Sequence, residues 1–346
     1  MMQCAAEEPS THGNADHSWA LVLAAGEGSR LQALTTNASG IPVPKQFCSL
    51  GGGSSLLQDA LQRVACIAPR QRTCVVVAAQ HRRWWEELSA TLPTQNIIVQ
   101  PRNRGTANGI LLPLLRILQR DPDASLLVLP SDHYVRDEAV LATGLQQALQ
   151  VSWRSNRIVL AGFAPEAPDP ELGYIVPSGE GTAGAVDVRE FVEKPCESAA
   201  RQLTSRGGLW NSFIFAARGR TLLRLFEQRC PEIVMEMRGL VATADAGMRP
   251  DPNLIEMYER LPVLDFSRDI LERCASQLQV LRVPPCGWSD LGTPVRVAQV
   301  LGNNGPKHHA RTPRPADAGG GFLSLAAQYA KFLAAQACVE ATGDTR

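Results

Sequence analysis

A run of small and apolar residues near the start of the chain ends in a glycine turn. Residues 20–25 (ALVLAA) lead into Gly26-Glu27-Gly28-Ser29-Arg30, and Lys45 follows in Pro44-Lys45-Gln46-Phe47. Glycines at 26 and 28 remove the Cβ atoms that would hold backbone N–H groups away from an anion, and they tolerate positive φ. The pattern therefore predicts a buried strand followed by a phosphate-binding turn, with Arg30 and Lys45 supplying positive charge.

Two better-known phosphate loops do not fit this turn. The dinucleotide fingerprint G-x-G-x-x-G needs a third small residue where this chain has Leu31, and the P-loop needs a Gly-Lys-Ser/Thr sequence that the chain lacks. Taken alone, the turn fits an ordinary strand-to-helix connection equally well. The two cations favour the anion-binding interpretation.

Composition restricts the class of protein and the kind of partner. The chain has 346 residues, 45% of them hydrophobic, and 34 basic residues balance 34 acidic ones. With no net charge there is no overall field to draw nucleic acid or an anionic membrane, so we expect small-molecule partners. No apolar run approaches the roughly 18 residues that a membrane span needs, and no signal peptide is apparent, so we expect a cytoplasmic protein. The nine cysteines form no C-x-x-C pair, and we assign no transition metal.

Strand-like runs alternate with helical patterns over the first half of the chain. The strand candidates are Ala20–Ala24, Cys74–Ala79, Ile97–Gln100, Ser125–Leu129 and Ile158–Phe163. This alternation predicts an α/β fold whose parallel sheet has helices on both faces. In such sheets ligands bind beyond the carboxyl ends of the strands, so the loops after Ala25, Gln100 and Leu129 should meet there.

Two helix starts can be predicted from local signals. A capping box, Ser55-x-x-Gln58, precedes apolar residues at helical spacing, and Thr106 precedes a similar run through Ile117.

From about Leu172 the pattern changes to shorter strands, Gly173–Pro177, Val186–Glu193 and Leu209–Ala217, which predict a smaller mixed β layer or lid on the same sheet. We expect a disordered tail over residues 1–17, one domain over 18–302, a linker over 303–320 and a C-terminal helix within 321–346.

Two aspartates are candidates for a magnesium site. Asp132 lies directly after the apolar strand that ends at Leu129, and Asp290 lies in Trp288-Ser289-Asp290-Leu291-Gly292. Magnesium favours few carboxylates together with phosphate oxygens, so the pair could hold Mg²⁺ if the fold brings them together. The structural alternative for Asp132 is an Asx turn or a helix cap.

A third group suggests recognition of a phosphorylated sugar. Glu193, Asn211 and the turn near Gly173 offer groups that bind hydroxyls, while Lys194 can pair with a monoester phosphate. Taken singly, Glu193 and Lys194 would form a surface ion pair and Asn211 a turn. Their number and order favour a site.

Seven motifs occur in the order typical of one family. They are residues 23–31 (LAAGEGSRL), 44–47 (PKQF), 100–107 (QPRNRGTA), 130–133 (PSDH), 191–195 (FVEKP), 210–212 (WNS) and 288–292 (WSDLG). On these motifs the chain resembles the sugar-1-phosphate nucleotidyltransferases, and most closely the mannose-1-phosphate guanylyltransferases (GDP-mannose pyrophosphorylases), over about residues 19 to 300.

The resemblance implies a Rossmann-like nucleotide-binding fold and a nucleotidyltransferase reaction. The phosphate of a sugar 1-phosphate attacks the α-phosphorus of a nucleoside triphosphate, and GTP with mannose 1-phosphate would give GDP-mannose and pyrophosphate. The implied catalytic residues are Arg30, Lys45 and Asp132, with Asp132 and Asp290 as ligands of Mg²⁺. The implied nucleotide contacts are Ala24, Ala25, Gly26, Gly28, Ser29, Arg104, Gly105, Thr106 and Ala107. The implied sugar-phosphate contacts are Gly173, Glu193, Lys194 and Asn211.

Departures from the family pattern leave the sugar and the base open. Gly105 stands where the family has a second asparagine-like residue, Phe213 replaces a small residue, and the family's Asp-Tyr pair is missing near Phe266. The same reaction on another pair, such as one with glucose 1-phosphate, remains an alternative, as does a catalytically silent subunit that binds a nucleotide-sugar. We expect a single activity, and a homodimer remains one option for the oligomeric state.

Overall fold

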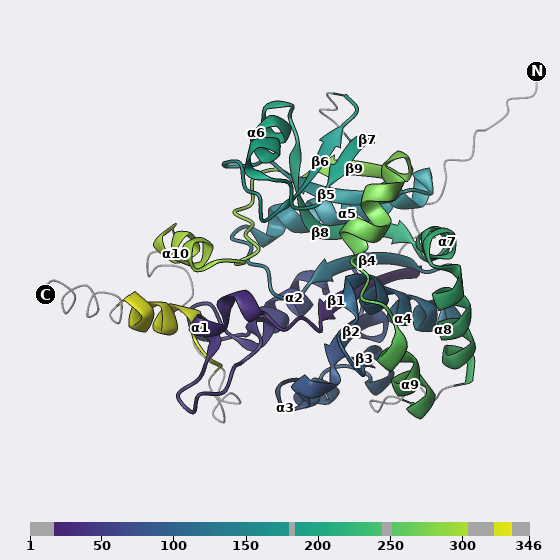
Figure 1. The fold of residues 1–346 in the computed structure, drawn as a ribbon, viewed down its shortest axis with the longest axis horizontal. Coiled ribbons are helices and arrows are strands. Elements are labelled where there is room, and N and C mark those ends of the chain that lie inside the picture. The colour runs from purple at the N-terminus through teal and green to yellow at the C-terminus, as the bar shows by residue number, and fades with distance from the viewer. Residues whose placement is uncertain (1–16, 180–183, 244–250, 304–321, 334–346) are drawn as a thin grey trace, which may run out of the picture.

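The structure is a computed structural model that describes residues 17–179, 184–243, 251–303 and 322–333. The expected disordered tail lies outside the described residues except at position 17, as does the expected linker except at position 303. Within these ranges the strands are β1 (Ser18–Ala24), β2 (Thr73–Ala78), β3 (Ile97–Gln100), β4 (Ser125–Pro130), β5 (Ile158–Phe163), β6 (Gly173–Pro177), β7 (Ala185–Val192), β8 (Leu209–Arg218) and β9 (Leu278–Arg282). They form one sheet in the order β3-β2-β1-β4-β8-β5-β9-β7-β6, which runs through the whole molecule (Figure 1).

The first half of the sheet is the parallel unit that the sequence predicts. β3, β2, β1 and β4 are parallel neighbours, and in the centre Val22 of β1 pairs with Val75 of β2 and with Leu129 of β4. Strands this apolar must be covered on both faces. The predicted α/β fold is confirmed, and the carboxyl ends of these strands lie at one edge.

The second half of the sheet closes on itself. β8 is antiparallel to β4, β5 and β6, β5 is parallel to β9, and β7 is antiparallel to both β9 and β6. The pairings β8-β5-β9-β7-β6-β8 therefore form a ring, so the later strands continue the same sheet. The sequence analysis missed β9, which is five residues long and interrupted by polar Gln279.

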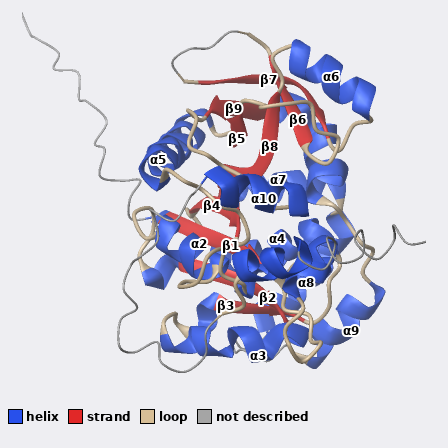
Figure 2. Ribbon diagram, turned by 90° about the vertical axis from the view of Figure 1, so that its left-hand side faces the viewer, coloured by secondary structure: helices blue, strands red, loops and turns tan. Residues whose placement is uncertain are grey.

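Helices cover both faces of the sheet. Those that the structure describes from end to end are α1 (Gln32–Thr35), α2 (Leu56–Val64), α3 (Arg82–Trp85), α4 (Gly105–Arg120), α5 (Glu138–Ser155), α6 (Glu197–Ser205), α7 (Gly219–Arg229), α8 (Pro231–Thr243), α9 (Pro252–Arg260) and α10 (Pro294–Asn303). One apolar cluster packs α2, α3, α5 and α10 on one face, and a second packs α4, α7, α8 and α9 on the other. Figure 2 shows α2 and α5 on one side of the strands and α8 and α9 on the other.

Local signals placed one helix start correctly and the other two positions late. At α2 the Ser55 amide donates to Oε1 of Gln58 at 2.9 Å and the Gln58 amide donates to Oγ of Ser55 at 3.2 Å, which is the predicted capping box. α4 starts at Gly105, so Thr106 lies inside the first turn, where its Oγ1 accepts from the Phe266 amide at 2.7 Å. Thr106 therefore ties α4 to a distant segment and does not cap the helix.

The expected C-terminal helix is described over part of its length. Residues 325–333 are helical, and fully buried Leu325 packs into the same cluster as α2 and α5. The Leu325 amide donates to the Ser49 carbonyl at 2.9 Å, and the Ser49 amide donates to the Leu323 carbonyl at 3.0 Å. These bonds fix the helix beside the loop that follows Lys45. Within the described ranges, the structure contains no helix with the length and apolarity that crossing a membrane requires.

Candidate active site

The side chain of Gln46 fixes the glycine turn after β1. The buried side-chain amide of Gln46 donates to the carbonyls of Ala24 at 2.8 Å and Gly26 at 2.9 Å. Gly28 has φ +64°, and a Cβ there would lie 3.1 Å from the Lys45 backbone nitrogen. The turn therefore packs directly on the Pro44–Phe47 segment and needs glycine at its left-handed position.

Lys45 joins three motifs that are far apart in the sequence. Its buried Nζ lies 2.8 Å from Oδ2 of Asp132 and donates to the Asp290 carbonyl at 2.6 Å. Behind it, Tyr134 and Ser289 exchange two backbone hydrogen bonds of 2.9 Å, which hold the loop after β4 against the loop before α10. The structure thus brings the Lys45, Asp132 and Asp290 segments together. Lys45 is engaged by protein groups here, and its contact with a triphosphate stays a prediction.

Asp132 is an ionised carboxylate beside a cavity. Burial acts to raise its pKa, but the Lys45 ammonium, His133 and the hydrogen bonds to the carboxylate together outweigh this and hold the pKa below its ordinary value. The side chain keeps 31% exposure. Ser131 fixes the loop because both its amide and its hydroxyl donate to the Leu23 carbonyl, at 3.0 and 2.7 Å.

His133 is a neutral neighbour of this carboxylate. Burial lowers its pKa to about 4, although the Asp132 charge acts to raise it. Because an indole N–H can only donate, the Nδ1 that lies 3.3 Å from Nε1 of Trp288 must be the acceptor. Trp288 in turn stacks on Phe163 with ring centroids 4.9 Å apart. At neutral pH His133 therefore serves as an oriented hydrogen-bonding group.

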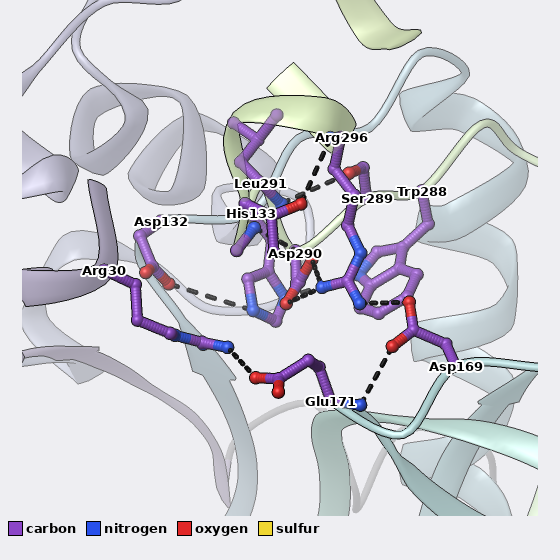
Figure 3. A network of polar contacts seen from close by, with 12 residues as sticks. Arg30, Asp132, His133, Asp169, Glu171, Trp288, Ser289, Asp290, Leu291 and Arg296 are labelled. Atoms are coloured by element: carbon purple, nitrogen blue, oxygen red, sulfur yellow. Dashed lines mark hydrogen bonds and ion pairs between the residues drawn. The ribbon is translucent and has the colours of Figure 1, made fainter. Parts of the chain in front are cut away.

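Asp290 carries a different set of partners. Both of its carboxylate oxygens accept from Nη1 of Arg296, at 2.6 and 2.8 Å, and Oδ1 also accepts from the Gly292 amide at 3.0 Å. The other guanidinium nitrogen of Arg296 pairs with Asp169. The Asp169 carboxylate accepts from the Glu171 amide at 2.9 Å, and Glu171 pairs with Arg30 at 3.0 Å (Figure 3). A continuous polar chain thus runs from α10 to the glycine turn.

This network places Arg30 at the surface. Its side chain is 52% exposed and its ion-pair partner is Glu171. A role for Arg30 on a triphosphate stays a prediction and requires that this exposed ion pair separate.

The two predicted metal ligands differ in their fit to magnesium. Asp132 is partly exposed at the cavity and suits a cation that also binds phosphate oxygens. Asp290 does not fit the expected role in this arrangement, because Arg296 already occupies both of its oxygens. The described residues contain no group of three or more His, Cys, Asp or Glu side chains that could hold a metal ion.

A cavity of about 490 Å³ lies beyond the carboxyl ends of β1, β3 and β4. Its lining includes Ala25, Gly26, Gln100, Asn103, Gly105, Thr106, Gly109, Asp132, His133, Phe213 and Asp265. Five of the predicted residues, Ala25, Gly26, Gly105, Thr106 and Asp132, are among them. The sequence analysis did not select Gln100, Gly109, Phe213 or Asp265, which lack a charge pattern or lie in a region where the family motif is absent.

The start of α4, which lines the cavity, is fixed by close backbone contacts and hydrogen bonds. Gly105 has φ +84°, and a Cβ there would lie 2.1 Å from the carbonyl oxygen of Leu264. The Ala107 amide donates to that same oxygen at 3.0 Å, and the Arg104 side chain donates to the Tyr258 carbonyl at 2.6 Å. This turn therefore requires glycine, and the Arg104 guanidinium has a structural role in it.

The predicted sugar-phosphate residues also come together. A Cβ on Gly173 would lie 2.6 Å from Oε2 of Glu193 and 3.2 Å from Cβ of Asn211. Asn211 Oδ1 accepts from the amide of the cavity residue Phe213 at 3.1 Å, which joins this group to the cavity. Lys194 is exposed and has φ +48°.

Glu193 is a half-buried acid with one oxygen that has no hydrogen-bond partner among the described residues. Its Oε2 is buried and makes no hydrogen bond within the described part of the chain. Burial, and then the nearby Asp265 carboxylate, raise its pKa to about 7, while Lys194 acts to lower it. Ser267 in the π-helical turn Phe266–Leu271 faces the same group, since its Oγ accepts from Asn211 at 3.4 Å.

Arg296 and Asp169 are the main polar residues that the sequence analysis missed. A signal for Arg296 exists, because Thr293-Pro294 marks a helix start and side chains of a first turn point back toward the preceding loop. Asp169 lies 127 positions away from Arg296, and no local pattern connects them.

Comparisons with known proteins identify the family of the chain. The profile of the nucleotidyl transferase family matches residues 19–301. Mannose-1-phosphate guanylyltransferases of Escherichia coli K12 and Salmonella typhimurium LT2 are each 32% identical to the chain over 289 residues. The match covers 79% of this chain in both cases but only 57% of the relative's length. A solved structure described as a mannose-1-phosphate geranyltransferase from Thermus thermophilus superimposes with a TM-score of 0.68 at 29% identity, covering 80% of this chain and 76% of that one.

Proposed function

The chain belongs to the nucleotidyl transferase family, and on that premise we propose that it transfers a nucleotidyl group from a nucleoside triphosphate to a sugar 1-phosphate. A phosphate oxygen of the sugar phosphate attacks the α-phosphorus, the bond from that phosphorus to the bridging oxygen breaks, and pyrophosphate leaves. The names of the relatives favour GTP and mannose 1-phosphate, which would give GDP-mannose.

The observation that supports this proposal is a cavity that is lined by the nucleotide-side residues and connected through Phe213 to the sugar-side residues. Its lining contains the glycine turn, the Gly105 turn and Asp132, and Phe213 links it to Asn211, Glu193 and Gly173. Carboxylate, lysine and backbone N–H groups at one edge of a parallel sheet suit a triphosphate. The unpaired Oε2 of Glu193 suits a sugar hydroxyl, which can donate to it.

The residues of this chain would act mainly by positioning and by charge. The attacking phosphate oxygen is already ionised, so no general base is needed, in agreement with a neutral His133. The glycine turn, with Arg30 and Ser29, would hold the triphosphate, while Lys45 fixes Asp132. Lys194 would pair with the sugar phosphate. A divalent ion such as Mg²⁺, held by Asp132 together with phosphate oxygens, would neutralise charge on the phosphoryl group.

A pyrophosphate-release assay tests the proposal. The purified chain is incubated with Mg²⁺ and each pairing of GTP, ATP, UTP or dTTP with mannose 1-phosphate or glucose 1-phosphate. We expect release with GTP and mannose 1-phosphate to be fastest. Faster release with another pair would assign a different sugar or base to the same chemistry.

Absence of release with every pair would contradict enzymatic activity. Binding of GDP-mannose in that case, measured by calorimetry, would identify a nucleotide-sugar-binding subunit.

A further inference from the structure

Arg296 occupies the place at Asp290 where a metal ion was expected. One nitrogen of its guanidinium lies within 2.6–2.8 Å of both carboxylate oxygens. Lys45 Nζ also donates to the Asp290 carbonyl at 2.6 Å, so two protein cations lie beside this residue.

The arrangement is built into the loop and does not rest on one flexible side chain. Arg296 is only 13% exposed, and its second nitrogen is held by Asp169. A Cβ on Gly292 would lie 2.4 Å from Oδ2 of Asp290 and 2.9 Å from Nη1 of Arg296, so the loop has room for this ion pair only with glycine at 292. Burial disfavours the charged form of Arg296, but the Asp290 and Asp169 carboxylates outweigh it and raise the pKa of the guanidinium above its ordinary value.

A divalent ion at Asp290 would have to displace this guanidinium. Magnesium needs oxygen lone pairs at about 2.0–2.1 Å in near-octahedral geometry, and a fixed positive charge on the same oxygens opposes it. At Asp132 the paired cation is the Lys45 ammonium on one oxygen, and the side chain is 31% exposed.

We infer that Arg296 takes the place of a metal ion at Asp290, so that this chain holds its divalent ion through Asp132 without a second protein carboxylate. This rests on the proposed function for the presence of a divalent ion beside the phosphates. Arg296 is then a positioning residue that sets the number and affinity of metal ions, while its own charge supplies a cation at Asp290.

Titration of the free protein with Mn²⁺, followed by electron paramagnetic resonance of the unbound ion, tests the inference without turnover. We expect Asp290→Asn to bind Mn²⁺ within about threefold of the wild type, because Asp290 is not a ligand there. Arg296→Gln should bind at least about tenfold more tightly, because it frees a carboxylate and removes a positive charge. The double variant Arg296→Gln/Asp290→Asn should lose that gain.

Control variants separate this effect from a general change in charge. Arg224→Gln removes an exposed arginine of α7 and should leave Mn²⁺ affinity unchanged. The single variant Asp132→Asn, made in the otherwise wild-type chain, should not bind Mn²⁺.

A tenfold loss of affinity in Asp290→Asn alone, or unchanged affinity in a folded Arg296→Gln protein, would overturn the inference. A wild type that binds no Mn²⁺ would contradict the assignment of the ion to Asp132. If Arg296→Gln does not fold, the other two single variants test the inference. Near-wild-type Mn²⁺ affinity in Asp290→Asn with no binding in Asp132→Asn supports it, and any other combination contradicts it. Failure of pyrophosphate release with this Mn²⁺ pattern intact would refute the proposed function alone.

Discussion

The two sides of the candidate site are constructed differently. On the nucleotide side, made of the Gly26–Arg30 turn, Lys45, residues 104–107 and Asp132, the buried polar groups are paired, and a Cβ on Gly28 or Gly105 would crowd the neighbouring backbone. On the sugar side, made of Gly173, Glu193, Lys194 and Asn211, a buried carboxyl oxygen has no hydrogen bond among the described residues and the lysine is exposed.

The nucleotide side is therefore preorganised, whereas the hydrogen bonds of the sugar side are completed only when the ligand binds. A group that is already fixed contributes to turnover through its position, because no reorganisation is needed during reaction. A group with unsatisfied hydrogen bonds gains most when the ligand arrives. Changes on the nucleotide side should therefore affect turnover and folding, and changes on the sugar side should affect sugar-phosphate affinity.

Asp132→Asn gives the largest expected effect. It removes the negative charge that Lys45 orients, and we expect turnover to fall at least about 100-fold in the pyrophosphate-release assay. The matched control is Asp123→Asn, an exposed aspartate paired with Arg220, which should keep wild-type rates. Normal turnover in Asp132→Asn would remove this residue from the site.

Gly105→Ala tests whether the nucleotide wall is as rigid as its packing indicates. A Cβ placed 2.1 Å from the Leu264 oxygen at φ +84° must force the backbone to shift. We expect the free energy of unfolding to fall by about 2 kcal/mol or more and the KM for the nucleotide to rise. Gly179→Ala meets nothing within 4 Å and should be neutral in the same denaturant titration. Equal stability of the two variants would contradict the comparison.

Lys194→Ala tests the sugar side. Loss of the exposed ammonium should raise the KM for the sugar phosphate about tenfold and leave the KM for the nucleotide within about twofold. Initial rates at varied concentrations of each substrate provide the measurement. An equal rise in both constants would mean that Lys194 does not distinguish the two sides.

Glu193→Gln reports on the carboxyl whose buried Oε2 makes no hydrogen bond among the described residues. Its pKa of about 7 in the folded protein exceeds the ordinary 4.5, so between these values the folded chain retains a proton that the unfolded chain has lost. Wild-type stability should therefore fall as pH rises through this window, by on the order of 2 kcal/mol, and level off above about pH 7. In melting curves from pH 5 to 8, the stability of Glu193→Gln relative to that of the wild type should increase as the pH rises. A constant difference across that range would show that Glu193 does not titrate there.

The parts of this protein that could be predicted from sequence are those set by short-range patterns. β1 to β5 follow from apolar runs, and α2 follows from its capping box. The parts that could not be predicted depend on tertiary contacts between distant segments. Thr106 looked like a helix start and instead accepts a hydrogen bond from Phe266, and β9 became a strand because it pairs with β5 and β7.

The same limit applies to the candidate site. The motifs selected Asp132, Glu193 and Asn211 because their residue types suit the proposed chemistry. The sequence analysis missed the pairing of Asp290 with Arg296. A carboxylate in a motif does not indicate which cation will pair with it in the folded protein.

The ring of β8, β5, β9, β7 and β6 has a consequence for self-association. Because β6 pairs with both β7 and β8, that end of the described sheet offers no row of open backbone groups to another chain. At the opposite end, β3 has one neighbour among the described strands, but it is four residues long and all four are buried. Strand pairing between copies thus finds no accessible template at either edge of the described sheet.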